Sequence, residues 1–137
     1  MSATLKPKVL FIGFGHLAKS LLSKKLLNSV NIHALNSKGV IKNINLKKKI
    51  LNFNNDYNYI FFLIRPNTFL TSGNQFHKYL SKETMVISCM AGIKLSTIEK
   101  TLKSKKIVRI MPNVMAFNNK SQTCLLYTSP SPRDLYQ

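Results

Sequence analysis

Five short, mostly apolar stretches are spaced along the chain, with polar or helix-like segments between them. They lie at 8–15, 30–35, 57–64, 84–90 and 106–111. The first holds a continuous apolar run from Val9 to Ile12, which is typical of a parallel strand covered on both faces. Strands of this kind that alternate with helices predict an α/β fold with a Rossmann-like, doubly wound, mostly parallel sheet.

Three of the intervening segments carry apolar residues at helical spacing. Over 16–28 we expect one helix with Lys24 and Lys25 in its last turn, where cations suit the helix dipole. Over 67–81 we expect a helix weakened at Gly73. Ser96 and Glu99 have capping-box spacing and predict the start of a third helix.

The segment 38–58 is rich in Lys and Asn and shows only weak periodicity. We expect a short helix there, with or without a short strand. This is the part of the chain that the pattern describes least.

The net charge of +17 raises the possibility of a nucleic-acid or membrane partner. Lysines number 18 and asparagines 14, however, and A/T-rich codons spell both, so codon bias explains the excess. The longest apolar run, Tyr59–Ile64, is far shorter than the roughly 18 residues of a membrane helix. We therefore expect a cytoplasmic protein with no nucleic-acid and no membrane partner.

The segment "GFGHLA" (Gly13–Ala18) matches the G-x-G-x-x-G/A pattern. It follows a predicted strand and opens a predicted helix, which is the context that dinucleotide binding requires. Gly13 would allow the tight turn, Gly15 would let the backbone approach a pyrophosphate, and Ala18 would allow close helix packing. A glycine turn kept for packing alone is the alternative.

The end of the second strand bears on the cofactor. Sites for NAD usually have an Asp or Glu there that binds the ribose 2′-hydroxyl. This chain has Asn36, Ser37 and Lys38 instead, with no acid nearby. Because Ser and Lys can bind a 2′-phosphate, the sequence favours NADP, with NAD still possible.

The next strands end in "IRPN" (Ile64–Asn67), "SCMAGI" (Ser88–Ile93) and "RIMPN" (Arg109–Asn113). Ligands of open α/β sheets lie outside the carboxyl ends of the strands, so these loops would face the same cofactor. No His or Cys spacing indicates a metal site, and no pair of carboxylates indicates acid–base chemistry. Catalytic residues stay unassigned.

Taken together, "VLFIGFGHLAKSLL", "FFLIRP", "VISCMAGIKLSTIEKTL" and "KIVRIMPN" resemble the N-terminal domain of pyrroline-5-carboxylate reductase. That family reduces 1-pyrroline-5-carboxylate to proline with NAD(P)H. The resemblance implies three sets of cofactor-binding residues: Ile12, Gly13, Phe14, Gly15, His16 and Leu17 at the pyrophosphate; Asn36, Ser37 and Lys38 at the adenosine; and Leu63, Ile64, Arg65 and Pro66, with Ala91 and Gly92, at the nicotinamide.

The chain departs from the family at His16, where Asn or Gln is common, and at Arg65, where Lys is common. Its segment 38–58 is also shorter than usual. The family continues into a helical C-terminal domain that forms the dimer and completes the substrate pocket. The resemblance therefore implies an incomplete domain over 1–123, inactive alone, whose intact form is a homo-oligomer.

The last residues, 124–137, begin with "CLLYTSPSPRD", a Ser/Pro-rich stretch unlike the rest. It resembles the translation of adapter DNA from transposase-based sequencing libraries. We expect this stretch to be non-native, and a Ser/Pro linker is the alternative. Rival functions are another NADP-dependent imine or hydroxyacid reductase, a basic nucleic-acid-binding module, and a regulatory fragment.

Overall fold

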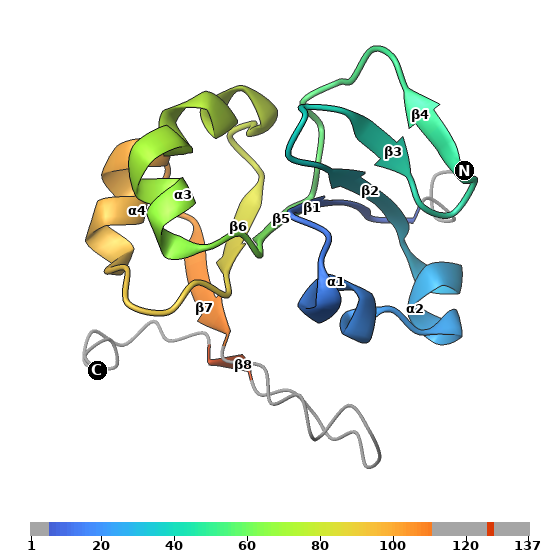
Figure 1. The fold of residues 1–137 in the computed structure, drawn as a ribbon, viewed down its shortest axis with the longest axis horizontal. Helices are drawn as coiled ribbons and strands as arrows, with labels where there is room; N and C mark the ends of the chain where they lie inside the picture. Colours follow the sequence, from blue (N-terminus) through green and yellow to red (C-terminus); the bar gives the residue numbers. More distant parts are fainter. Residues whose placement is uncertain (1–5, 111–125, 128–137) are drawn as a thin grey trace.

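The computed structural model describes residues 6–110 and 126–127, which form one sheet with helices on both faces (Figure 1). In chain order the elements are β1 (Lys8–Ile12), α1 (His16–Leu21), α2 (Lys24–Ser29), β2 (Asn31–Leu35), β3 (Ile41–Asn43), β4 (Lys48–Ile50), β5 (Tyr59–Phe62), α3 (Pro66–Ser72), the 3-10 helix η2 (Gly73–Tyr79), β6 (Met85–Ser88), α4 (Leu95–Leu102), β7 (Ile107–Ile110) and β8 (Leu126–Tyr127).

The sheet has the strand order β4-β3-β2-β1-β5-β6-β7-β8. Five neighbouring strands of this sheet are parallel to one another: β2, β1, β5, β6 and β7. The chain builds outward from β1 to β2, then crosses to the other side of β1 to form β5. The strand order thus reverses between β1 and β5, and the predicted doubly wound, mostly parallel sheet is confirmed.

The segment 38–58 forms a β-hairpin, so the short helix expected there was wrong. Strand β3 pairs antiparallel with β2, and β4 pairs antiparallel with β3. Gly39 in the β2–β3 loop and Lys47 in the β3–β4 turn both have positive φ values, of 82° and 58°. The hairpin therefore extends the parallel sheet beyond β2 with two antiparallel strands, and β4 is an edge strand.

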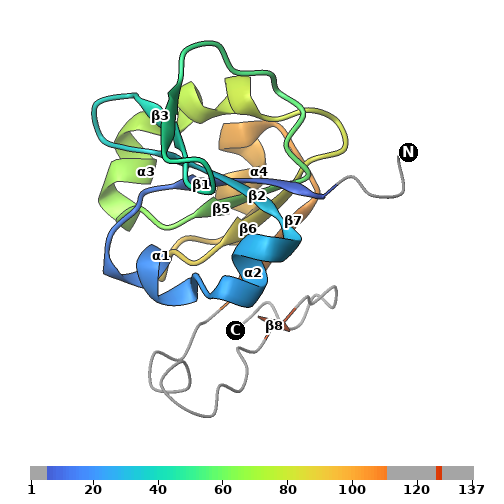
Figure 2. The same ribbon diagram turned by 90° about the vertical axis from the view of Figure 1, so that its right-hand side faces the viewer.

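Helices α1 and α2 cover one face of the sheet over β1 and β2 (Figure 2). The single helix expected over 16–28 was wrong: α1 ends at Leu21, and Ser23 begins α2 by accepting a hydrogen bond from the nitrogen of Leu26 at 3.0 Å. Lys24 and Lys25 consequently lie in the first turn of α2 rather than in a last turn. The buried residues of this face are Val9, Phe11, Ala18, Ile32 and Ala34.

Helices α3, η2 and α4 cover the opposite face and enclose the larger part of the core (Figure 2). The weak point expected at Gly73 is confirmed, because α3 ends there and the chain continues as a 3-10 helix. The capping box expected at Ser96 was wrong. Helix α4 begins at Leu95 after Lys94, and no side chain caps its start.

Strand β8 pairs antiparallel with the end of β7, with Arg109 opposite Tyr127 and Ile110 opposite Leu126. It falls within the stretch that the sequence assigns to adapter DNA, and the rest of that stretch lies outside the described residues, as does "MPN" (111–113). Within the part of the chain that the structure describes, no helix is both long and apolar enough to cross a membrane.

Candidate functional site

The turn after β1 requires glycine at its first position. Gly13 has a φ of +98°, and its nitrogen donates a hydrogen bond to the carbonyl of Leu35 at 3.1 Å. A Cβ at this position would lie 3.0 Å from Cγ2 of Ile64 and 3.1 Å from the carbonyl carbon of Leu63. The turn is therefore packed tightly between the ends of β2 and β5.

Gly15 has the opposite surroundings. It precedes α1 with extended backbone angles, and a Cβ built on it would meet nothing within 4 Å. No side chain caps the first turn of α1, and that turn holds no acidic residue. The uncapped amide groups leave a partial positive charge beside open space, which is an arrangement that can bind a phosphate group.

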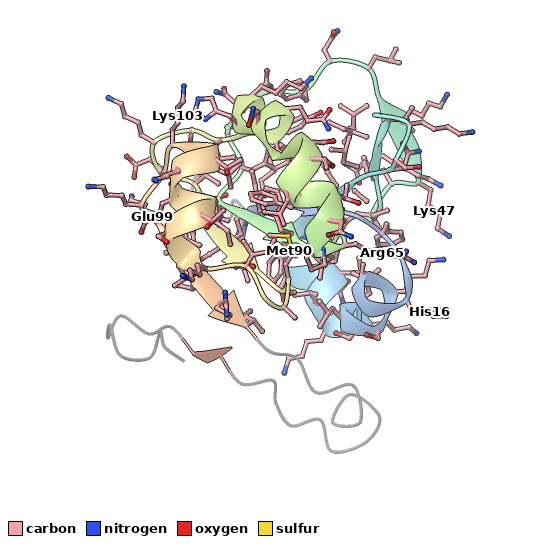
Figure 3. All side chains as sticks on the ribbon, turned by 60° about the vertical axis from the view of Figure 1, so that its left-hand side comes forward. His16, Lys47, Arg65, Met90, Glu99 and Lys103 are labelled. Atoms are coloured by element: carbon pink, nitrogen blue, oxygen red, sulfur yellow. The ribbon has the colours of Figure 1, made fainter. Side chains whose placement is uncertain are left out.

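Three further residues complete this loop. Ala18, at the last position of the motif, is fully buried against the sheet, as the motif predicts. Phe14 packs its ring at 6.3 Å from that of Phe11, and the ammonium of Lys19 lies 5.8 Å from the centroid of the Phe14 ring. The side chain of His16 is exposed at the start of α1 (Figure 3).

The loop after β2 is shaped by Asn36. Its side-chain oxygen accepts hydrogen bonds from the nitrogens of Lys38 and Val40 at 2.8 and 3.0 Å, and its carbonyl accepts one from Gly39. The side chains of Ser37 and Lys38 are exposed on this loop. Asn36 thus builds the loop, and Ser37 and Lys38 are presented by it.

The loop after β5 lies directly beside the glycine turn. The nitrogen of Leu63 donates to the carbonyl of Ile12 at 2.9 Å. Arg65 is exposed and precedes α3, and Pro66 occupies the first turn of that helix, where its missing N–H costs nothing. Ile64 is half-buried and packs against the larger core.

The loop after β6 has buried ends and an exposed tip. The nitrogen of Cys89 donates to the carbonyl of Phe62 at 3.1 Å, which joins this loop to the end of β5. Met90 and Ile93 are buried in the core. Between them Ala91 and Gly92 are exposed, and Gly92 has a φ of +82° with open space around it.

Hydrogen bonds between neighbouring loops therefore run along the carboxyl edge of four strands. They link Gly13 to β2, Leu63 to β1 and Cys89 to β5. Figure 3 shows Met90, Arg65 and His16 following one another along this edge. The structure thus brings all three predicted sets of residues to one edge of the sheet, next to the point where the strand order reverses.

Arg109 begins "RIMPN", a stretch that the sequence places at the cofactor edge without a role for this particular side chain. Its guanidinium Nη2 donates to the carbonyl of Ile93. Two features of the sequence single out this arginine. The strand around it is otherwise apolar, and in a lysine-rich chain Arg109 and Arg65 are the two arginines among the described residues.

Elsewhere, His33 and Tyr57 form a buried polar pair away from the loops. The Nδ1 of His33 and the hydroxyl of Tyr57 share a 2.7 Å hydrogen bond. Burial lowers the pKa of His33 from its ordinary 6.5, with a further lowering from Lys8 and an opposing effect of Asp56. Burial also raises the pKa of Tyr57. Both residues stay neutral near pH 7, which suits a structural role.

A shallow hollow lies at the opposite, amino-terminal edge of the sheet. It is lined by Pro7, Asn58, Tyr59, Glu83, Met85 and Lys106. Two of these residues, Glu83 and Lys106, form an exposed ion pair of 3.4 Å, and the glycine turn lies at the other end of the strands. Among the described residues, no group of three or more His, Cys, Asp or Glu side chains could hold a metal ion.

Comparisons with protein-family models and with curated proteins found no match. Among solved structures, the chain is similar to Plasmodium falciparum pyrroline carboxylate reductase with NADP bound, at 20% sequence identity and a TM-score of 0.58. The alignment covers 79% of this chain and 43% of that one. At this identity the likeness shows the fold. The chain has a Rossmann-like α/β fold, and it spans less than half the length of that reductase.

Proposed function

We propose that this chain is the dinucleotide-binding part of an NADP-dependent reductase that converts 1-pyrroline-5-carboxylate to proline. The contrast between Gly13 and Gly15 carries the proposal. A Cβ on Gly13 would collide with the end of β5, so that glycine is needed for the fold. A Cβ on Gly15 would meet nothing, so packing does not account for that glycine, and a ligand that approaches the backbone does.

The amide groups around the first turn of α1 bind the pyrophosphate. They are uncapped by any side chain, and no acidic side chain in that turn opposes a negative charge. Gly15 removes the side chain that would otherwise stand between these amides and the phosphate oxygens. A phosphate at this place offsets the unsatisfied donors of the helix end.

Ser37 and Lys38 bind the adenosine end. The loop that presents them is fixed by Asn36, so both side chains extend from a preformed turn. A hydroxyl and an ammonium can bind a 2′-phosphate, and no carboxylate in the loop repels it. The loop therefore favours NADP over NAD.

The nicotinamide lies near Pro66 and the tip formed by Ala91 and Gly92. When bound, NADPH supplies the hydride that reduces the C=N carbon of the pyrroline ring. The small side chains of the tip leave room for a flat ring, and the described carboxylates, Asp56, Glu83 and Glu99, lie outside the loops of this edge. The residues of this chain bind and orient the reactants.

The choice of substrate rests on the sequence resemblance, and the structural likeness to a pyrroline carboxylate reductase supports it. The rest of the enzyme would be a helical domain that completes the substrate pocket and joins two copies. We accordingly propose that the intact protein is a cytoplasmic homo-oligomer. The chain of 137 residues would bind the cofactor and form no proline.

Binding of NADPH to the full chain, measured by the quenching or transfer of its fluorescence, tests the proposal. We expect saturable binding that is tighter for NADPH than for NADH, together with no proline formation from added 1-pyrroline-5-carboxylate. A folded chain that binds neither nucleotide would refute the assignment. A measured proline-forming rate would refute the proposed inactivity of this chain while supporting the reductase itself.

The rival functions give different results in the same assays. A basic nucleic-acid-binding module predicts DNA retention that falls steeply with salt and no protection from thermal unfolding by NADPH. Another imine or hydroxyacid reductase predicts the same NADPH binding. The native gene sequence beyond codon 123 would separate that case, because the proposed substrate-binding domain would be encoded there.

A further inference from the structure

Arg109 lies on β7, next to the exposed loop that follows β6. Its backbone is in register with Ser88, the last residue of β6. Its side chain is half-buried on the face that carries α3, η2 and α4, and Nη2 donates a hydrogen bond to the carbonyl of Ile93. The guanidinium of Arg109 thus links β7 to the loop that follows the neighbouring strand, β6.

The surroundings of Arg109 do not explain an arginine on grounds of stability. No carboxylate among the described residues pairs with it, and its buried Nε has no hydrogen-bond partner there. A half-buried cation without a counter-ion costs free energy relative to an apolar residue. The hydrogen bond to Ile93 is the specific contact that Arg109 contributes in return.

The hydrogen bond from Arg109 to Ile93 holds the C-terminal end of the loop 89–94. At the first end, the side-chain oxygen of Ser88 accepts a hydrogen bond from the nitrogen of Met90 at 3.2 Å, and the Met90 side chain is buried. At the second end, Ile93 is buried and its carbonyl is held by Arg109. The tip of Ala91 and Gly92 is therefore fixed from both sides.

We propose that Arg109 is a positioning residue that sets the place of the Ala91–Gly92 tip against the nicotinamide end of the dinucleotide. The inference rests on the proposed function and adds a residue to it. Arg109 does not touch the cofactor; it acts through the carbonyl of Ile93. The long, planar guanidinium spans from β7 to this carbonyl.

The test compares two nucleotides that share an adenosine end. NADPH contacts the whole edge, whereas adenosine 2′,5′-bisphosphate carries the 2′-phosphate and lacks the nicotinamide. We expect Arg109→Met in the full chain to weaken NADPH binding by about tenfold, the effect of losing one hydrogen bond from a charged group. Binding of adenosine 2′,5′-bisphosphate should stay within about twofold, because it lacks the nicotinamide that the tip would contact.

Lys105→Met is the matched control, because it removes one positive charge from an exposed position just before β7. It should change neither affinity. Arg109→Lys should lose less NADPH affinity than Arg109→Met, since an ammonium can still donate toward the loop. Hydrogen exchange at the backbone amides of 90–94 should quicken in Arg109→Met and not in Lys105→Met.

Equal weakening of both nucleotides by Arg109→Met would show a general structural role and overturn the inference. So would wild-type binding of NADPH that is no tighter than binding of adenosine 2′,5′-bisphosphate, because the tip would then contribute nothing. If Arg109→Met does not fold, Arg109→Lys with the exchange measurement decides. A wild-type chain that binds neither nucleotide is instead the failure of the proposed function.

Discussion

Gly13 lies against the backbone of Leu63 so closely that an added Cβ would come within 3.1 Å of its carbonyl carbon and 3.2 Å of its carbonyl oxygen. The neighbour is backbone, which cannot rotate away as a side chain can. The φ of +98° adds a second obstacle, because it is unfavourable for residues with a Cβ. Both effects point to a requirement for glycine that is independent of any ligand.

We therefore expect Gly13→Ala and Gly15→Ala to separate folding from binding. Gly13→Ala should lower the free energy of unfolding by about 2–4 kcal/mol, from strain in φ together with overpacking. Gly15→Ala should lower it by no more than about 1 kcal/mol, since its backbone is extended and its surroundings are open. Urea unfolding of the three proteins measures both values.

Gly15→Ala should nevertheless weaken NADPH binding by at least about tenfold, because the new methyl group stands where the phosphate approaches. Unchanged NADPH affinity in this variant would contradict the proposed cradle. Equal loss of stability in both variants would contradict the distinction drawn between the two glycines.

Lys38→Glu should shift the nucleotide preference. The side chain is exposed and the loop depends on the backbone nitrogen of residue 38, so the turn made by Asn36 should persist. A carboxylate in place of the ammonium repels the 2′-phosphate, and NADPH affinity should fall about tenfold while NADH affinity holds. The control is Lys100→Glu on α4, which makes the same charge change at another exposed position. Parallel changes for NADPH and NADH would count against a 2′-phosphate site here.

Asn45 should be among the costliest polar residues to remove. Its side-chain oxygen accepts from the nitrogen of Ile32 at 2.7 Å, and its amide donates to the carbonyls of Leu27 and Val30 at 2.8 and 3.0 Å. Asn45→Ala leaves three backbone groups without these partners. We expect a loss of about 2–4 kcal/mol in the free energy of unfolding.

Asn52→Ala is the comparison for Asn45, because Asn52 is exposed beyond the hairpin and its replacement should cost less than about 0.5 kcal/mol. Urea unfolding of both variants measures the difference. Similar stabilities would mean that the hairpin is held by its strand pairing alone.

These asparagines explain why the sequence predicted one part of the fold well and another part poorly. The parallel strands are continuous apolar runs between turn residues, and this pattern is visible without any knowledge of their partners. The hairpin over 41–50 instead depends on Asn36, which shapes the loop that leads into it, and on Asn45, whose hydrogen bonds reach backbone groups of α2 and β2. In an Asn-rich chain the composition does not single them out.

The helix boundaries were missed for a related reason. Apolar spacing continues from α1 into α2 because both helices pack apolar residues against the same sheet face, so the break at Leu22 and Ser23 does not interrupt the pattern. At α4, the helix starts two residues earlier than the motif indicates, which moves Ser96 into the first turn. The position of Arg109 beneath Ile93 similarly depends on the pairing of β6 with β7.

The buried pair of His33 and Tyr57 should make stability depend on pH. Burial is the largest cause that lowers the pKa of His33 from 6.5; the charge of Lys8 also lowers it, and Asp56 raises it. The folded state therefore binds a proton at His33 less readily than the unfolded state. The resulting stability is present above the ordinary pKa of 6.5 and is lost as the pH falls below that value.

Wild-type protein should consequently unfold at a lower urea concentration at pH 5.5 than at pH 7.5. In His33→Gln the midpoint should change less between these two values of pH, even though the variant is less stable at both because the bond to Tyr57 is altered. Identical shifts in the wild type and in His33→Gln would show that protonation of His33 does not couple to unfolding.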